Sequence, residues 1–430
     1  MSGHLFDEFP PVSARQWKQK IQMDLKGAPY DTLITHTPEG IDIRPFYHRD
    51  EYLTLSSTRF PEGFHIITPL HGNSGEEDIR QVLERAVDAV SIVLPAHLSP
   101  RDLADYRNRL YIHARLDRIN EARAWLEEGF KVFFAPLSYF TRYGNWSVSG
   151  QWDDMLRPVL AQYPSAFVSV DGALFADAGA HLSQQIAYTL AQSQEYIRRL
   201  GKEFIRQIRL EMATGSRYMA EIAKLRALRY LWEDPWQTGA WIHTRPTLRN
   251  KSFLDPYTNM LRTGMEMMAA LQGGSNEMTN LPYDYLTATS PESQRLADNQ
   301  LIILREEVRM EGLHASDGSY FFDELSYRMA AKAADILEQL EKGGGYVAQL
   351  HKGTIQSQIA RSADAQQQKF DKGELVLIGV NKYPRPDEPA VRPLPHAFAE
   401  QRQGKTLIRP VIPRRLAEKK EKAFLKKKSS

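Results

Sequence analysis

The sequence contains no cysteine and no long hydrophobic run. Without cysteine the chain forms no disulfide bond, binds no metal through thiolates and has no cysteine nucleophile. No stretch approaches the roughly 18 apolar residues that a membrane-spanning helix needs, and the N-terminal segment lacks the apolar centre of a signal peptide. These absences predict a cytoplasmic protein without a membrane-spanning segment.

The sequence also has little excess of either charge. It holds 55 lysine and arginine residues against 53 aspartate and glutamate residues, a net charge of +2 over 430 residues. A general nucleic-acid-binding protein carries a marked positive excess, so we expect no nucleic-acid partner. The exception is the basic segment from Arg414 to Lys428. We interpret it as a solvated end, with contact to a partner or an anionic surface as the alternative.

Apolar runs of strand length alternate with amphipathic helical patterns along most of the chain. Eight such runs occur, at 65–67, 90–94, 110–113, 131–135, 166–170, 208–212, 240–243 and 277–281, and helical patterns separate most of them. Strands and helices that alternate in this way favour an α/β fold of the (β/α)8, or TIM-barrel, type over an open doubly wound sheet.

Four regions follow from this pattern. Residues 1–60 are predicted to form an arm that contacts another subunit, because Trp17, Ile21 and the extended run 40–47 carry more apolar surface than a free tail exposes. The TIM barrel is expected over 61–345, and a post-barrel helix and strand over 346–383. Residues 384–430 are interpreted as a Pro-rich linker and a basic tail.

Short segments spread along the chain carry a family resemblance. They are Asp24–Gly27, Gly40–Tyr47, Ala180–Leu190, Gly215–Arg226, Asp255–Thr263, Ser316–Phe321 and Ile378–Tyr383. In this order they resemble landmarks of the methylmalonyl-CoA mutase barrel, and the resemblance extends over about residues 17 to 383. It implies a carbon-skeleton rearrangement of an acyl-CoA, started by a radical from adenosylcobalamin. It also implies a TIM barrel around the CoA ester and a separate α/β domain for the cobalamin.

Parts that the family's catalytic subunit needs are missing. Where that subunit has Ser-Gly-Tyr-His after its fifth strand, this sequence has Asp171-Gly172-Ala173-Leu174. Neither Ala173 nor Leu174 can donate a side-chain hydrogen bond to a substrate carbonyl, so we expect no catalytic residue. The Asp-x-His-x-x-Gly motif that carries the cobalt-ligating histidine is also absent. We therefore expect no cobalamin-binding domain and no metal site in this chain.

The polar loop after the seventh strand keeps part of the family pattern. His243 is retained, and Arg245 stands where the family has glutamine. We predict these two residues as cofactor-binding positions, with an ordinary strand-end histidine as the alternative for His243. Arg245, Arg249 and Lys251 could form a cationic rim for CoA phosphates, and a solvated loop is the alternative.

The whole pattern resembles the small, non-catalytic subunit of heterodimeric mutases. It predicts a structural or regulatory subunit beside a catalytic large mutase subunit, with adenosylcobalamin bound by the complex and none by this chain alone. One alternative is an active barrel half that binds an acyl-CoA and borrows its cobalamin domain from a separate polypeptide. A second alternative is a non-enzymatic interaction scaffold.

Overall fold

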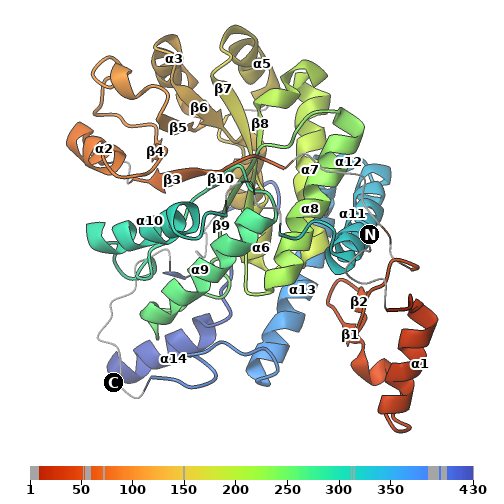
Figure 1. Cartoon of the computed structure of the whole chain (residues 1–430). Coiled ribbons are helices and arrows are strands. Elements are labelled where there is room, and N and C mark those ends of the chain that lie inside the picture. The colour runs from red at the N-terminus through yellow and green to blue at the C-terminus, as the bar shows by residue number, and fades with distance from the viewer. Residues whose placement is uncertain are drawn as a thin grey trace, which may run out of the picture.

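The barrel predicted from the alternating pattern is present. The computed structural model describes residues 9–51, 53, 60–70, 73–148, 151–310, 312, 315–385, 397–398 and 404–429. Within these residues, parallel strands close into a barrel in the order β10-β3-β4-β5-β6-β7-β8-β9 (Figure 1). The strands are β3 (His65–Pro69), β4 (Ala89–Val93), β5 (Leu110–Ala114), β6 (Lys131–Phe134), β7 (Ala166–Asp171), β8 (Ile208–Thr214), β9 (Ile242–Pro246) and β10 (Glu277–Met278).

Helices surround the barrel on its outside (Figure 1). They are α2 (Glu76–Leu83), α3 (Ile119–Glu127), α4 (Pro136–Tyr143), α5 (Trp152–Gln162), α6 (Ala173–Ala178), α7 (Leu182–Leu200), α8 (Tyr218–Trp236), α9 (Pro256–Gln272), α10 (Pro291–Glu306) and α11 (Tyr320–Lys342). Short 3-10 turns occur at 30–33, 104–106, 116–118 and 202–207. Asp255 stands at the N-cap position of α9 and Pro256 in its first turn, a pairing in the sequence that is typical of a helix start. No helix in the described part of the chain is long and apolar enough to cross a membrane.

Successive side chains of a barrel strand point alternately to the surrounding helices and into the barrel, so the fold has an outer and an inner apolar layer. Leu210 and Met212 of β8 belong to the large core shared with the surrounding helices. Arg209 and Glu211, which alternate with these two residues, therefore point into the barrel, because successive side chains of a strand face opposite sides. The interior has its own apolar cluster, made up of Ile67, Ala89, Tyr111 and Phe133, with Phe167 and Trp241 against them.

The region after the barrel differs from its prediction in two ways. The expected single helix is broken at Gly353 (φ 74°) into α12 (Gly345–Lys352) and α13 (Thr354–Asp371). The expected strand at 375–380 is wrong, since the chain turns there and forms only an isolated bridge between Ile378 and Lys382. Gly379 has φ 77°, a left-handed conformation that ends an extended run.

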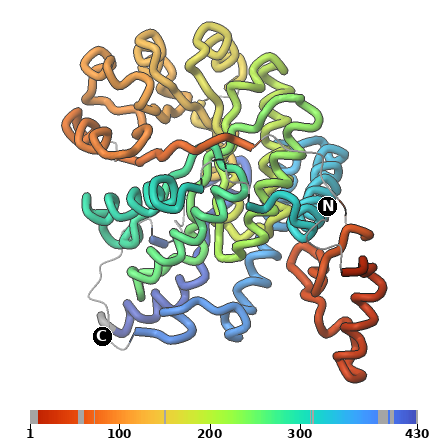
Figure 2. The backbone as a smooth tube through the Cα atoms, viewed as in Figure 1, coloured from red at the N-terminus to blue at the C-terminus, as the bar shows by residue number. Residues whose placement is uncertain are grey.

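The N-terminal arm lies to one side of the barrel (Figure 2). It consists of α1 (Ala14–Asp24) and a small antiparallel pair, β1 (Thr35–His36) and β2 (Asp42–Ile43). Its buried Glu39 accepts a hydrogen bond from the backbone N–H of Leu182, at the start of α7, over 3.1 Å. Trp17 is 50% exposed and Met23 is 75% exposed. The arm therefore contacts the barrel through Glu39, in the turn between β1 and β2, and it exposes Trp17 and Met23 on α1 to solvent.

The interpretation of Arg414–Lys428 as a solvated end is wrong for four of its residues, which are buried: Arg415, Leu416, Ala417 and Glu421. Residues 407–416 donate backbone hydrogen bonds to the C-terminal ends of α4 and α6, which follow β6 and β7, and to the loop after β9. Leu407 donates to Gly144 (3.0 Å), Val411 to Thr141 (2.9 Å), Arg414 to Asp177 (2.9 Å) and Leu416 to Arg249 (2.9 Å). The last described element is α14 (Glu418–Ser429), in which Lys419, Lys420, Lys422, Lys426 and Lys427 are exposed. The Pro-rich run at 386–396 lies outside the described residues.

Candidate functional site

A buried charge network crosses the interior of the barrel. The guanidinium of Arg209 donates to Glu277 Oε2 (3.1 Å) and to Glu211 Oε1 (2.9 Å). The hydroxyl of Tyr111 donates to Glu277 Oε1 (3.0 Å), and Lys131 Nζ donates to Tyr111 (3.1 Å). Each buried charge thus has a partner of opposite charge or a polar group, as burial requires.

The aromatic side chains of the interior pack around this network. The guanidinium of Arg209 lies 4.0 Å from the centre of the Phe133 ring. The rings of Phe133 and Phe167 are stacked with centres 5.2 Å apart, and Trp241 meets Phe167 edge to face at 5.0 Å. This layer fills the middle of the barrel with side chains.

Ionisable groups gather on the C-terminal side of this layer. Burial raises the pKa of Glu211, but Arg209 and two nearby imidazoles outweigh it and hold that pKa at about 2. Asp171, the register partner of Glu211 on β7, has a raised pKa because it is buried beside that carboxylate. Burial, reinforced by Arg209, lowers the pKa of His113 to about 4 and that of His243 to about 3. Both imidazoles are therefore neutral at neutral pH.

The two predicted cofactor-binding residues both lie on β9. The Nε2 atom of His243 is 2.9 Å from Thr279 Oγ1, and its Nδ1 atom is buried without a hydrogen-bond partner in the described residues. Arg245 forms an ion pair with Asp177 Oδ2 over 2.6 Å and donates to the carbonyl of Pro246. Burial lowers the pKa of Arg245, but Asp177 and Asp171 raise it above its ordinary value. A ligand at this strand end would therefore meet a neutral imidazole and a guanidinium that is already paired with Asp177.

The positions that replace the family's catalytic residues follow β7 directly. Ala173 and Leu174 open α6, and both are buried. The backbone N–H of Leu174 donates to Asp171 Oδ1 over 3.0 Å. The carboxylate of Asp171 therefore holds the start of α6.

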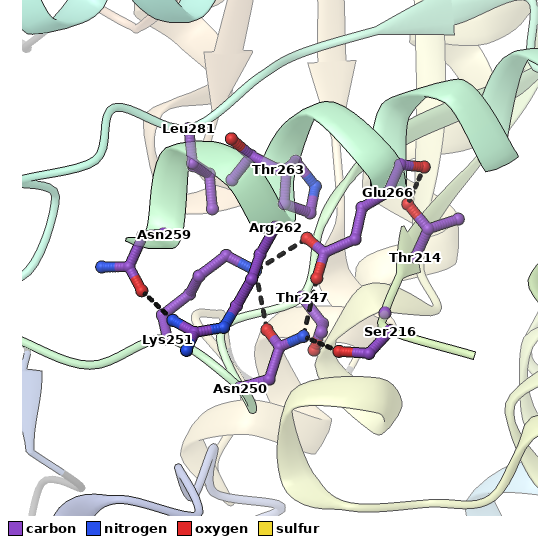
Figure 3. Close-up of polar contacts among 12 residues, drawn as sticks. Thr214, Ser216, Thr247, Asn250, Lys251, Asn259, Arg262, Thr263, Glu266 and Leu281 are labelled. Carbon is purple, nitrogen blue, oxygen red and sulfur yellow. Dashed lines mark hydrogen bonds and ion pairs between the residues drawn. The ribbon is translucent and has the colours of Figure 1, made fainter. Parts of the chain in front are cut away.

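The loop after β9 holds a third charged cluster (Figure 3). Lys251 Nζ lies 2.7 Å from Glu266 Oε2, and both side chains are buried. Asn250 donates to Glu266 Oε1 and to Ser216 Oγ, each over 2.6 Å. Burial lowers the pKa of Lys251 and raises that of Glu266. This cluster ties the loop to α9 and to the loop after β8.

The same loop is held from outside by the C-terminal segment. Glu421 of α14 accepts from Ser252 Oγ (2.7 Å), from the backbone N–H of Phe253 (3.2 Å) and from Arg415 (2.8 Å). Glu421 is fully buried, although it lies in a lysine-rich helix. Of the cations in the predicted rim, Arg245 and Lys251 are paired with carboxylates of the chain itself.

Several residues of these charged clusters were not predicted from the sequence. Arg209 and Glu211 are two positions apart in an apolar strand run, so they lie on one face, and a pair of charges there is a signal for a buried network. Asp177, Glu266 and Glu421 gave no such signal, because each lies in an ordinary helical pattern.

The family model and the related sequences agree on the family. The family model described as methylmalonyl-CoA mutase matches residues 157–427. The chain is 28% identical to the methylmalonyl-CoA mutase small subunit of Porphyromonas gingivalis, over 88% of this chain and 71% of that protein. It is 34% identical to the methylmalonyl-CoA mutase of Cereibacter sphaeroides, over 50% of this chain and 33% of that protein.

A third relative is the probable methylmalonyl-CoA mutase small subunit of Mycobacterium tuberculosis. The chain is 30% identical to it, over 53% of this chain and 40% of that protein. The match thus spans well under half the length of two of these three relatives. Because the family model covers more than half of the chain and the barrel is the expected one, this chain belongs to the methylmalonyl-CoA mutase family.

Proposed function

We propose that this chain is a structural or regulatory subunit of an adenosylcobalamin-dependent acyl-CoA mutase, acting beside a catalytic large subunit. The observation that carries the proposal is the filled barrel interior. A CoA ester enclosed by a barrel needs an open passage along the axis. Here Phe133, Phe167 and Trp241 are packed at ring distances of 5.0 to 5.8 Å in the space that such a passage would occupy.

Opening the interior carries a large free-energy cost. The aromatic layer would have to leave its packed positions, and the ion pair between Arg209 and Glu277 would have to be broken or exposed. Removing one partner from a buried ion pair costs roughly 3 to 5 kcal/mol, and a large aromatic side chain contributes a similar amount. A ligand would have to offset both costs, which favours a barrel that binds no CoA ester.

The C-terminal rim does not fit a bound cobalamin either. Residues 407–416 already hydrogen bond to α4 and α6, which follow β6 and β7, and to the loop after β9. Arg245, Lys251 and Arg415 are paired with Asp177, Glu266 and Glu421. The adenosylcobalamin of the complex is therefore assigned to the partner, where it would supply the radical chemistry.

An activity assay on the purified chain tests this proposal. With methylmalonyl-CoA and added adenosylcobalamin, we expect no succinyl-CoA. Leu174→His should remain inactive, because one imidazole restores neither the passage nor a cobalamin domain. A catalytic large subunit assayed in parallel shows that the assay works. Turnover that scales with the concentration of the isolated chain would contradict the non-catalytic role.

Calorimetric titration with methylmalonyl-CoA addresses the two alternatives. An active barrel half should bind the ester and should lose about 1 to 3 kcal/mol of binding free energy in Arg245→Ala. A structural subunit should give little or no heat of binding but should still pair with the catalytic subunit. A scaffold of another kind should bind neither. Circular dichroism of Arg245→Ala checks that the loss of the Asp177 partner has not unfolded the barrel.

The N-terminal arm supports a protein partner. Phe9, Val12, Trp17 and Met23 are all exposed on it, which is a large apolar surface for a solvated segment. The arm is held to the barrel by polar contacts, among them the ion pair between Arg217 Nη1 and Glu39 Oε1 at 2.6 Å. The partner proposed for this surface is the catalytic large subunit, and a cytoplasmic location fits the cysteine-free sequence.

A further inference from the structure

Arg249 is a buried arginine that forms no ion pair with the described residues. Its side chain donates to three neutral oxygens: Gln366 Oε1 (2.9 Å), the carbonyl of Arg414 (2.6 Å) and the carbonyl of Ala363 (3.0 Å). Burial and the neighbouring charge of Arg414 lower its pKa to about 10. Glu418, Asp177 and Asp364 favour the charge only through space, so the guanidinium of Arg249 has no carboxylate of the described residues in direct ion-pair contact.

The other buried arginines of the described chain, unlike Arg249, form ion pairs with carboxylates. Each has at least one carboxylate within ion-pair distance: Arg209 with Glu211 and Glu277, Arg226 with Asp323, Arg229 with Glu233, and Arg415 with Glu421. Taking a guanidinium out of water without an anion is costly, so an unpaired one in a folded protein calls for a ligand that supplies the missing charge.

A pocket of about 310 Å³ opens beside Arg249, between α13 and the C-terminal segment. Arg414, Lys419 and Lys422 also line it, together with Asp364 and Glu418. The ion pairs of these lysines and of Arg414 are long: 3.6 Å for Arg414 with Asp364 and for Lys419 with Asp371, and 3.9 Å for Lys422 with Glu418. The cations around the pocket therefore outnumber the acids, and Arg414, Lys419 and Lys422 are only loosely engaged.

We propose that this pocket binds the phosphate or diphosphate group of a small polyanion, with Arg249 at its base and Lys419 and Lys422 at its mouth. Guanidinium and ammonium groups recognise phosphate through charge-assisted hydrogen bonds. The bound anion would join three elements, namely the β9 loop, α13 and α14, and would clamp the C-terminal segment onto the barrel. The site does not depend on any mutase activity of this chain.

Titration calorimetry on the full chain at low ionic strength tests the site. The probes are inorganic pyrophosphate and ADP, which distinguish a free diphosphate from the diphosphate of a nucleotide. We expect saturable binding of at least one probe. In Lys419→Gln/Lys422→Gln the affinity should fall by about tenfold or more, because two charge-assisted contacts are lost. Both substitutions are on exposed side chains, so the fold should be retained.

The matched control is Lys420→Gln/Lys426→Gln, which removes two exposed charges of the same helix that do not line the pocket. This variant should bind the probes as the unmodified chain does. Hydrogen exchange of residues 414–422 should slow when the ligand is added. Equal affinity in the two double variants, absence of binding to both probes, or unchanged exchange would each overturn the assignment.

Discussion

Arg209 on β8 and Glu277 on β10 form a buried ion pair inside the barrel, with 3.1 Å between Nη1 and Oε2. Neither strand is adjacent to the other in the sheet, since β9 lies between them. The pair therefore joins β8 to β10 across the interior of the barrel, past β9. Arg209 also serves Glu211, so one guanidinium balances two carboxylates.

Arg209→Met should strongly destabilise the fold. It would leave both carboxylates buried without a cation, and loss of one partner of a buried pair costs roughly 3 to 5 kcal/mol. Urea denaturation followed by circular dichroism measures the free energy of unfolding. The control is Arg101→Met, which removes an 85% exposed arginine paired with Glu128 at 3.5 Å and should cost at most about 1 kcal/mol. A similar small loss in both variants would show that the interior network does not stabilise the barrel.

The pair of Lys251 and Glu266 should behave as a coupled unit. Lys251→Met alone leaves a buried carboxylate, and Glu266→Gln alone leaves a buried ammonium, so each is expected to cost several kcal/mol by the same argument. The double variant should cost less than the sum, with a coupling energy of about 1 to 3 kcal/mol. Urea denaturation of the four proteins completes the cycle. Additive losses would mean that the two side chains do not interact in solution.

Glu421→Gln should loosen the C-terminal segment without unfolding the barrel. The amide keeps the size of the side chain but leaves Arg415 buried without its anion. Limited trypsin digestion should then cleave after Arg414 or Arg415 faster than in the unmodified chain. Glu338→Gln, in an exposed pair with Lys342 on α11, is the matched control and should leave the digestion rate unchanged. If both variants are cut at the original rate, the segment is held by other contacts.

The two interior histidines should make stability depend on pH in the acid range. In the folded state the pKa of His113 is about 4 and that of His243 is about 3, against an ordinary value of 6.5. Below pH 6.5 the unfolded chain binds protons that the folded chain does not, so stability is complete above that pH and falls toward pH 4. The slope is about 1.4 kcal/mol per pH unit for each proton taken up.

Replacing these histidines should flatten that slope. Urea denaturation of His113→Gln/His243→Gln between pH 6.5 and 4 should show a shallower decline than the unmodified chain. His36→Gln, which alters a histidine of the exposed β1 strand, serves as the surface control. An identical slope in the double variant and the unmodified chain would assign the acid sensitivity to other groups.

Deletion of residues 1–50 tests the proposed partner surface. We expect the truncated chain to lose co-purification with the catalytic large subunit, because Trp17 and Met23 leave with the arm, and to keep its barrel. Size-exclusion chromatography with light scattering reports pairing, and far-UV circular dichroism reports the fold. Trp17→Ala/Met23→Ala is a gentler variant that keeps the arm's polar contacts to the barrel. Pairing of the truncated chain at full strength would remove the arm from the interface.

The barrel and its order of elements could be predicted from the sequence because they follow from local periodicity. Apolar runs of strand length recur with helices between them, and backbone geometry fixes both periods without reference to distant residues. The start of α9 could be predicted for the same reason, since Asp255 and Pro256 act on the adjacent turn. The segment at 375–380 shows the limit, because its apolar residues suit a strand but Gly379 and Asn381 close a turn instead.

The partners of the charges were decided only by the tertiary structure. Nothing local to Arg245 indicates Asp177, which lies 68 residues earlier, and a lysine-rich helix gives no sign that its Glu421 meets Ser252, 169 residues away. Local pattern predicts which residues share a face. Which charges meet depends on strand register, barrel closure and the path of the C-terminal segment, and these are fixed only when distant parts of the chain pack together.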